Sequence, residues 1–351
     1  MRKLTMIAAI GGLCLVSSAE AAHVANKAAY SVATIDYPGF RGTTTANGIS
    51  NSQRIVGAFS VPSTQYGYGF IEFQGRFALL PSAPCRSGHC DTTPLAINSR
   101  GEIAGEFSQD PTHRSVFVLR GPLLTMVSVP GTRDLSILGG LNERGEVVGF
   151  FQTDAGPIRT FLYNGLFATV LPAPAGVTDM AGKAISNSGQ ITGSFDDSKG
   201  LHGFLQTRGQ FSRFDVPGAV ETSPVAINSP GDVIGTYAVP SAAAVPTQHG
   251  FLMVRGRFTR LDFPGGLNTT PTALNDAETV VGTYENPALR APFNTNAFVY
   301  QRGTFTRLAL PGAVQSVGAI SASGTIVGTY FDASCPVSCS VHGFTATAVG
   351  H

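Results

Sequence analysis

The stretch Ile227-Asn-Ser-Pro-Gly-Asp-Val-Ile-Gly-Thr-Tyr237 recurs, with variations, seven times along this chain of 351 residues. Each copy has a glycine within an apolar run and an aromatic residue two positions later, and successive glycines lie 42 to 48 residues apart. A strand-like repeat of about 40 to 50 residues is typical of one blade of a β-propeller. The glycines are Gly57, Gly105, Gly149, Gly193, Gly235, Gly282 and Gly328, and the aromatic residues are Phe59, Phe107, Phe151, Phe195, Tyr237, Tyr284 and Tyr330.

The composition agrees with an all-β fold. The chain contains 42 Gly and 22 Pro, and its short apolar runs are separated by Gly, Pro, Asn and Ser, as strands are by turns. No helical periodicity follows the N-terminal segment. We therefore predict an all-β, seven-bladed β-propeller with four-stranded blades, formed by residues 22–351 as one domain.

Four strand-like segments make up each repeat, and in the sixth they are residues 271–275, 279–284, 296–300 and 305–312. We name them A to D. Proline is tolerated at strand ends and sheet edges, so the Pro-Gly that ends segment D favours the outer edge of the blade and places A innermost. The A–B connections carry glycine where a type I turn closes into a bulge. Because Gln53 and Glu278 replace that glycine in two repeats, we expect those two turns to be strained or differently shaped.

The repeated residues have a structural interpretation. Glycine inside a strand normally weakens it, so seven glycines at one position indicate close approach of neighbouring backbone or side chains. The aromatic residue two positions later is expected to pack between adjacent blades. Segment C adds a phenylalanine in every repeat, which we interpret as part of the core.

The two ends of the repeat series complement each other. Residues 30–39 form a D segment with no A, B or C before it, and residues 342–349 form a C segment with no D after it. We predict that residues 30–36 pair with residues 343–349. The N-terminal strand then closes the last blade and removes an open sheet edge that would promote aggregation.

Residues 1–21 resemble a signal peptide. Arg2 and Lys3 precede an apolar run, and Ala19-Glu20-Ala21 matches the small-x-small cleavage pattern. The apolar run is too short to span a bilayer comfortably. We expect a secreted or periplasmic protein, with no membrane span and in monomeric form.

Four cysteines remain after such cleavage: Cys85, Cys90, Cys335 and Cys339. An even number in an oxidising compartment indicates two disulfides. Short spacing favours Cys85–Cys90 and Cys335–Cys339, but a crossed pairing such as Cys90–Cys335 stays open, because both loops are expected on one face of neighbouring blades. The spacing also suits zinc, but no histidine cluster accompanies it, so we expect no metal and no cofactor.

Without Arg2, Lys3 and Glu20 the chain has 21 basic and 21 acidic residues. No basic stripe is present, which argues against nucleic acid and anionic membrane surfaces as partners.

The triplets His202-Gly-Phe204, His249-Gly-Phe251 and His342-Gly-Phe344, the stretch at 227–237 and the stretch at 256–265 resemble the HAF-repeat extracellular proteins of bacteria. The resemblance covers essentially all of 22–351, and the strand order is similar to that of kelch-type propellers. It departs where Ser115-Val-Phe117 and Arg159-Thr-Phe161 replace the triplet. The resemblance implies a secreted repeat protein and supplies no activity and no catalytic residue.

Signals of catalysis are few. The three triplet histidines occupy one repeat position and are therefore spread around the ring, and no G-x-S-x-G, H-E-x-x-H or P-loop motif occurs. Asp196, Asp197 and Asp332 follow strand B and suit either glycoside chemistry or polar turns; we favour turns.

Two function classes follow. The first is a non-enzymatic scaffold that binds a protein, a glycan or a cell-envelope component, and the second is a glycan hydrolase or lyase with acidic residues near the central channel. We favour the scaffold. Gly, Ser and Thr at the channel mouth would support it, whereas Asp, Glu, His and Arg with perturbed pKa values would support the enzyme. The long variable segments share one face, where we expect binding: residues 60–67, 82–93, 238–248 and 285–295.

Overall fold

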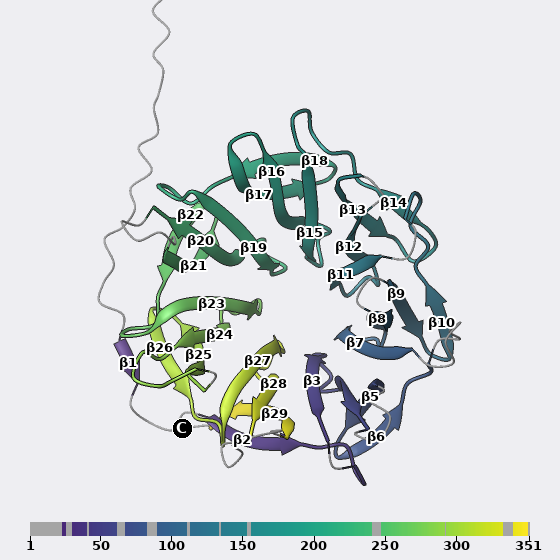
Figure 1. Ribbon diagram of the computed structural model, residues 1–351, viewed down its shortest axis with the longest axis vertical. Coiled ribbons are helices and arrows are strands. Elements are labelled where there is room, and N and C mark those ends of the chain that lie inside the picture. The colour runs from purple at the N-terminus through teal and green to yellow at the C-terminus, as the bar shows by residue number, and fades with distance from the viewer. Residues whose placement is uncertain are drawn as a thin grey trace, which may run out of the picture.

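The computed structural model describes residues 23–25, 30–40, 42–61, 67–82, 90–110, 113–132, 135–152, 156–240, 247–291, 293–332 and 340–349. In these residues seven antiparallel four-stranded sheets surround a common centre (Figure 1), which confirms the predicted seven-bladed all-β propeller. No helix in this part of the chain is long and apolar enough to cross a membrane.

Six blades each use four consecutive strands, in the order A, B, C, D from the centre outward. Blade 1 contains β3 (Thr44–Ile49), β4 (Ile55–Ser60), β5 (Gly67–Phe73) and β6 (Arg76–Leu79). Blade 2 contains β7 (Asp91–Ile97), β8 (Ile103–Asp110), β9 (His113–Arg120) and β10 (Leu123–Met126). Blade 3 contains β11 (Ser136–Leu141), β12 (Val147–Gln152), β13 (Ile158–Tyr163) and β14 (Ala168–Val170).

The remaining blades follow the same order. Blade 4 contains β15 (Asp179–Ile185), β16 (Ile191–Asp197), β17 (Gly200–Thr207) and β18 (Gln210–Phe214). Blade 5 contains β19 (Glu221–Ile227), β20 (Val233–Val239), β21 (Thr247–Val254) and β22 (Arg257–Leu261). Blade 6 contains β23 (Leu267–Leu274), β24 (Val280–Glu285), β25 (Thr295–Gln301) and β26 (Thr304–Leu308). Blade 7 contains β27 (Ala313–Ile320), β28 (Ile326–Phe331), β29 (Val341–Ala348) and β2 (Tyr30–Ile35).

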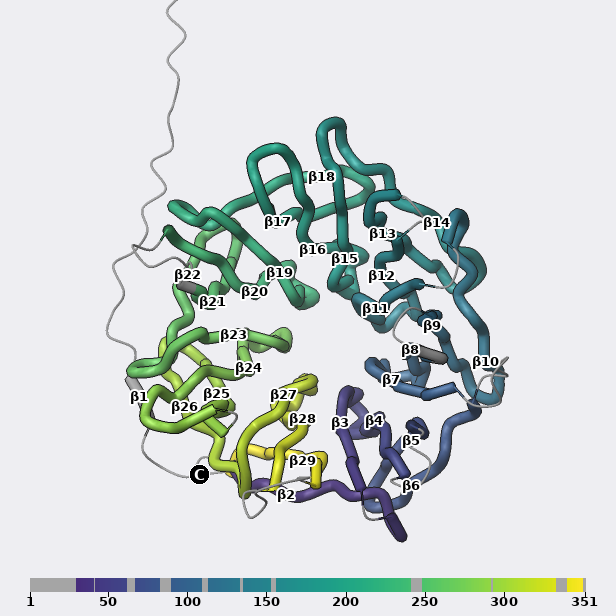
Figure 2. The backbone as a smooth tube through the Cα atoms, viewed as in Figure 1, coloured from purple at the N-terminus to yellow at the C-terminus, as the bar shows by residue number. Residues whose placement is uncertain are grey.

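Blade 7 is closed by the N-terminal strand, as predicted. β2 runs antiparallel to β29, from the pair Tyr30–Ala348 to the pair Ile35–Gly343. Figure 2 shows purple β2 beside yellow β29 in this blade. One further strand was not expected from the sequence: β1 (His23–Ala25) runs parallel to β26 on the outer edge of blade 6.

The strand-B glycines make room for the strand-C phenylalanines. Gly282 lies directly opposite Phe298, and the same pairing recurs in every blade. A Cβ on Gly282 would lie 2.2 Å from the Thr270 carbonyl oxygen and 2.9 Å from the Phe298 ring. All seven of these phenylalanines are fully buried. In each repeat the strand-B glycine and the strand-C phenylalanine therefore pack together as one unit.

The aromatic residue after each glycine joins neighbouring blades. Tyr284 of blade 6 stacks on Phe263 in the connection from blade 5, with ring centroids 3.7 Å apart and planes 6° apart. Phe59 of blade 1 stacks in the same way on Tyr37, which follows the closing strand β2. These stacks cover the boundaries between blades, as the sequence predicted.

The A–B turns of blades 1 and 6 keep the common shape and carry backbone strain. The Gln53 N–H donates to the Ser50 carbonyl at 3.0 Å, and the Glu278 N–H donates to the Asn275 carbonyl at 3.2 Å, as in the glycine-containing turns. Gln53 has a φ of 61° and Glu278 a φ of 55°. Of the two outcomes expected for these turns, strain is therefore the one observed.

The A–B turns also hydrogen-bond to each other around the ring. Asn142 Nδ2 donates to the Ser186 carbonyl of the next blade at 3.1 Å, and equivalent bonds start from Asn98, Asn228 and Asn275. Between blade 7 and blade 1 the Ala322 N–H donates to Asn51 Oδ1 at 2.8 Å. We call this set of contacts the turn belt.

Candidate functional site

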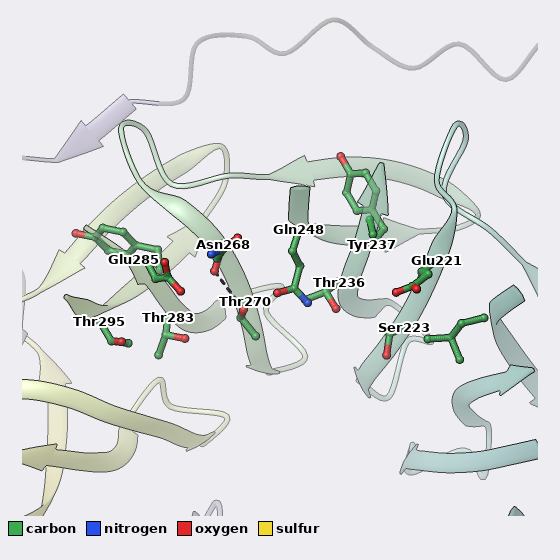
Figure 3. Close-up of a pocket in the computed structure, with 13 residues that line it drawn as sticks. Glu221, Ser223, Thr236, Tyr237, Gln248, Asn268, Thr270, Thr283, Glu285 and Thr295 are labelled. Carbon is green, nitrogen blue, oxygen red and sulfur yellow. Dashed lines mark hydrogen bonds between the residues drawn. The ribbon is translucent and has the colours of Figure 1, made fainter. Parts of the chain in front are cut away.

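A hollow lies on the inner side of blades 5 and 6, at the face of the B–C and D–A connections (Figure 3). Its volume is about 650 Å³, within the range of small-molecule sites. Blade 5 contributes Glu221, Ser223, Thr236, Tyr237, Ala238 and Gln248, blade 6 contributes Asn268, Thr270, Thr283, Tyr284, Glu285 and Thr295, and blade 4 contributes Leu201.

Cross-strand pairing places these side chains. Ser223 lies opposite Thr236, and the equivalent pair in blade 6 is Thr270 and Thr283, so the two blades present hydroxyls in the same way. Glu285 lies opposite Thr295 at the end of the strand ladder. This pair, together with Ala238 and Gln248 in blade 5, lies at the bases of the long connections 238–248 and 285–295. The hollow is therefore on the face where binding was expected.

Most polar side chains of the hollow have no hydrogen-bond partner among the described residues. Within the described residues, only two of the lining side chains form hydrogen bonds: Ser223 accepts one from Lys183, and Thr270 Oγ1 donates to the Asn268 carbonyl at 3.2 Å. The polar lining side chains without such a partner are Glu221, Thr236, Tyr237, Gln248, Asn268, Thr283, Tyr284, Glu285 and Thr295. The Thr236 side chain is only 7% exposed, but its hydroxyl is not one of the buried polar atoms that lack a partner, so it remains accessible. The hollow thus offers a set of donors and acceptors to a ligand.

Lys183 adds a cation beside the hollow. A bulge in β15 between Gly182 and Ala184 leaves Lys183 outside the regular ladder, and its Nζ donates to Ser223 Oγ at 2.9 Å. Burial lowers the pKa of the Lys183 ammonium, because the charged form loses hydration there. Since the Ser223 oxygen accepts this bond, its own hydrogen is free to donate into the hollow.

The opposite face has a smaller hollow of about 210 Å³ inside the turn belt. Its polar groups are largely engaged: Asn228 and Asn275 donate to neighbouring turns, Glu143 accepts from the Ser99 N–H at 2.9 Å, and Asp276 accepts from the Ser229 N–H at 2.8 Å. These contacts hold the blades together and leave few groups for a ligand.

The triplet histidines are each paired with an aspartate. His202 Nδ1 contacts Asp215 at 2.8 Å and its Nε2 contacts Asp197 at 3.1 Å. His249 pairs with Asp262, and His342 pairs with Asp36 at 2.8 Å. These contacts support the structural interpretation of the three histidines.

Each of these histidines also packs against the aromatic residue of strand B. The ring centroids are 5.3 Å apart for Phe195 and His202, and the same distance separates the pairs in blades 5 and 7. The backbone N–H of Lys199 lowers the pKa of Asp197, and His202 and Arg213 act in the same direction. Asp197 is therefore held as an anion within a polar cluster.

A sequence signal for these pairs was available. Aspartate occurs two positions before the last proline of strand D only in repeats that carry the triplet histidine; elsewhere that position holds Leu79, Ser128, Pro172 or Ala309.

The expected acidic sites do not converge. Asp196 and Asp197 end β16 in blade 4, whereas Asp332 follows β28 in blade 7, on the other side of the ring (Figure 1). Glu221 and Glu285, which do share a hollow, were missed because neither belongs to a repeated motif. Among the described residues no group of three or more His, Cys, Asp or Glu is arranged to hold a metal ion.

The cysteines are mostly outside the described residues. Cys90 is buried beside the start of β7, whereas Cys85, Cys335 and Cys339 lie in segments that the structure does not describe. Their pairing stays a prediction. The central parts of the connections 60–67, 82–93 and 238–248 also lie outside the described residues.

Comparison with solved structures finds propellers. The chain is similar to a structure from a study of two prolyl endopeptidases (10% identity, TM-score 0.59, 89% of this chain and 51% of that one). It is also similar to the β-propeller domain of the Trilobed protease from Pyrococcus furiosus (9% identity, TM-score 0.57, 89% and 96%). A third is a puromycin-hydrolyzing peptidase from Mycobacterium tuberculosis (13% identity, TM-score 0.56, 86% and 50%).

The chain spans about half the length of the first and third of these structures. No family model and no curated protein matches the sequence. At these identities the likeness shows the fold alone. Fold and comparisons together define a seven-bladed β-propeller scaffold.

Proposed function

We propose that this chain is a secreted, monomeric, non-enzymatic propeller that binds a partner protein or cell-envelope component in the hollow between blades 5 and 6. One observation carries the proposal: nine polar lining side chains have no hydrogen-bond or ion-pair partner among the described residues, and they line a hollow of about 650 Å³. A few accessible donors and acceptors in a concave site are what orient a bound ligand. A bound ligand would supply the missing partners.

The composition of the lining supports binding over catalysis. Hydroxyl and amide groups dominate it, and it contains no histidine, cysteine or arginine. Ser and Thr at the channel mouth are the feature that the sequence analysis connected with a scaffold.

Export and disulfides are parts of the same proposal. The signal-like segment 1–21, the HAF-repeat resemblance and the even number of later cysteines support them. Mass measurement of the protein recovered from the medium or periplasm would test cleavage after Ala21, and non-reducing peptide mapping would identify the cysteine pairs.

A second candidate function is cleavage of a glycan. Glu221 and Glu285 line one hollow, and a pair of carboxylates on either side of a bound sugar is the usual arrangement in glycoside hydrolysis. Turnover of a polysaccharide that is lost in both Glu221→Gln and Glu285→Gln would favour this candidate over the scaffold.

The binding proposal is tested with a glycan array and a cell-envelope extract, each probed with the purified full domain. Thr236→Val and Gln248→Ala change the hollow without changing net charge, and Ser229→Ala on the turn-belt face is the matched control. We expect the first two variants to lose the captured ligand and the control to retain it. Loss of binding confined to the Ser229→Ala variant would place the site on the opposite face and refute the proposal.

A further inference from the structure

The two carboxylates of the hollow lack cationic partners. Glu221 begins β19 and Glu285 ends β24, and Figure 3 shows them on opposite sides of the hollow. Within the described residues neither has a Lys, Arg or His nitrogen within 4 Å, whereas Asp197 pairs with Arg213 and Asp262 with Arg260 on the same face. The two carboxylates therefore have no direct counter-charge, and the cation beside the hollow, Lys183, is bonded to Ser223 instead.

The groups between the carboxylates are suited to accept hydrogen bonds. Gln248 and Thr236 lie between Glu221 and Glu285 in Figure 3; the Thr236 side chain is only 7% exposed, and its hydroxyl has no partner among the described residues. Thr283 and Thr295 add two further hydroxyl oxygens that have no partner among the described residues. An ammonium or guanidinium group carries several donors and no acceptor, so it would satisfy such oxygens together with a carboxylate.

The aromatic rings of the hollow do not suit a sugar. Sugar rings commonly stack their C–H groups on an exposed aromatic face, but Tyr237 is 7% exposed and Tyr284 is 5% exposed. Phe263 covers one face of Tyr284, and His249 packs against Tyr237. A neutral glycan would also leave both carboxylates without a counter-charge.

Lys183 makes the part of the hollow at Ser223 chemically different from the parts at the two glutamates. Its ammonium lies at Ser223 and disfavours a second cation there, while the Ser223 hydroxyl hydrogen is free for an acceptor on the ligand. The site thus favours an acceptor group near Ser223 and cationic groups near the two glutamates.

We infer that the hollow binds a chain with two cationic groups, ammonium or guanidinium, which pair with Glu221 and Glu285; this inference rests on the proposed binding function. A basic peptide and a free polyamine share this chemistry. The peptide also provides a carbonyl for the Ser223 hydroxyl, which a polyamine lacks.

The test uses isothermal titration of the full domain with three probes: a tetrapeptide with lysine at its first and fourth positions, the same peptide with norleucine at both, and spermidine. We expect the lysine peptide to bind and its affinity to fall as NaCl is raised, because partly exposed ion pairs are screened. Glu221→Gln and Glu285→Gln should each weaken binding about two- to fivefold. Glu278→Gln makes the same charge change on the opposite face and should leave binding unchanged.

The other outcomes either identify the source of the ligand or refute the inference. Spermidine binding with the same dependence on Glu221 and Glu285 would identify a polyamine as the ligand source. Equal binding of the norleucine peptide, or no charge-dependent binding of either cationic probe, would overturn the inference. If the inference fails, the proposed binding function still stands when the envelope screen captures a ligand that the Thr236→Val variant no longer binds. If the screen also captures no such ligand, the proposed function is refuted as well.

Discussion

Replacing Glu278 with glycine should stabilise this protein, although it deletes a side chain. Glu278 has a φ of 55°, and a left-handed conformation costs a non-glycine residue about 1–2 kcal/mol. Substitution by glycine relieves this strain, but the greater freedom of glycine in the unfolded chain offsets about 0.4–1 kcal/mol of the relief. The Glu278 side chain is exposed and has no hydrogen bond among the described residues. We therefore expect a net gain of about 0.5–1 kcal/mol.

Gln53 provides the matched control. Its φ of 61° carries the same strain, but its Nε2 donates to Ser321 Oγ at 3.2 Å and to Ser323 Oγ at 3.1 Å, between the last blade and the first. Each such bond contributes about 0.5–1.5 kcal/mol at most, so its loss cancels the relief of strain. Gln53→Gly should be neutral or destabilising.

Urea denaturation of both variants beside the wild type measures the difference as a shift in the midpoint at constant slope. The Glu278→Gly midpoint should move up, and the Gln53→Gly midpoint should stay or move down. Equal stabilisation by both substitutions would show that the two Gln53 hydrogen bonds contribute nothing. A destabilised Glu278→Gly would refute the assignment of strain itself.

Three further predictions concern the fold. Gly282→Ala places its Cβ 2.2 Å from the Thr270 carbonyl oxygen and should lose about 1–3 kcal/mol or more in the same urea denaturation. Gly256→Ala, with open space and a φ of +77°, should lose only about 1 kcal/mol. Burial raises the pKa of Glu106 above 4.5, so the charged form destabilises the fold at neutral pH. Glu106→Gln should therefore melt at a higher temperature than the wild type at pH 7, and this gain should vanish below pH 4.5. A difference in melting temperature that does not depend on pH would contradict this prediction. Deleting residues 30–35 should expose the edge of β29 and cause aggregation in size-exclusion chromatography, and a monodisperse product would argue against the role of β2 in closure.

The sequence predicts the ring because each repeat encodes one packing unit. A glycine and a phenylalanine meet at the same cross-strand position in all seven blades, so the spacing of Gly57, Gly105 and the later glycines fixes the number of blades. Closure by β2 follows from the incomplete repeats at the two ends. The parallel strand β1 was not predictable, since it belongs to no repeat.

The hollow was harder to predict because it depends on residues that differ between repeats. Glu221 and Glu285 occupy different positions in their repeats, and they line one hollow only because blades 5 and 6 are neighbours. The contact between Lys183 and Ser223 depends on a β-bulge, which takes Lys183 out of the regular pairing between β15 and β16. The sequence did identify the face, since the long connections 238–248 and 285–295 begin and end at residues that line the hollow.

The pairing of β2 with β29 also sets the order in which the molecule can be completed during synthesis. The ribosome makes Tyr30 first and its partner Ala348 more than three hundred residues later. Blades 1 to 6 have all their own strands as soon as each repeat emerges, but β2 must wait, unpaired, for the last segment of the chain. A chain truncated before β29 therefore retains an unpaired β2, and the last blade has an open edge until synthesis is finished.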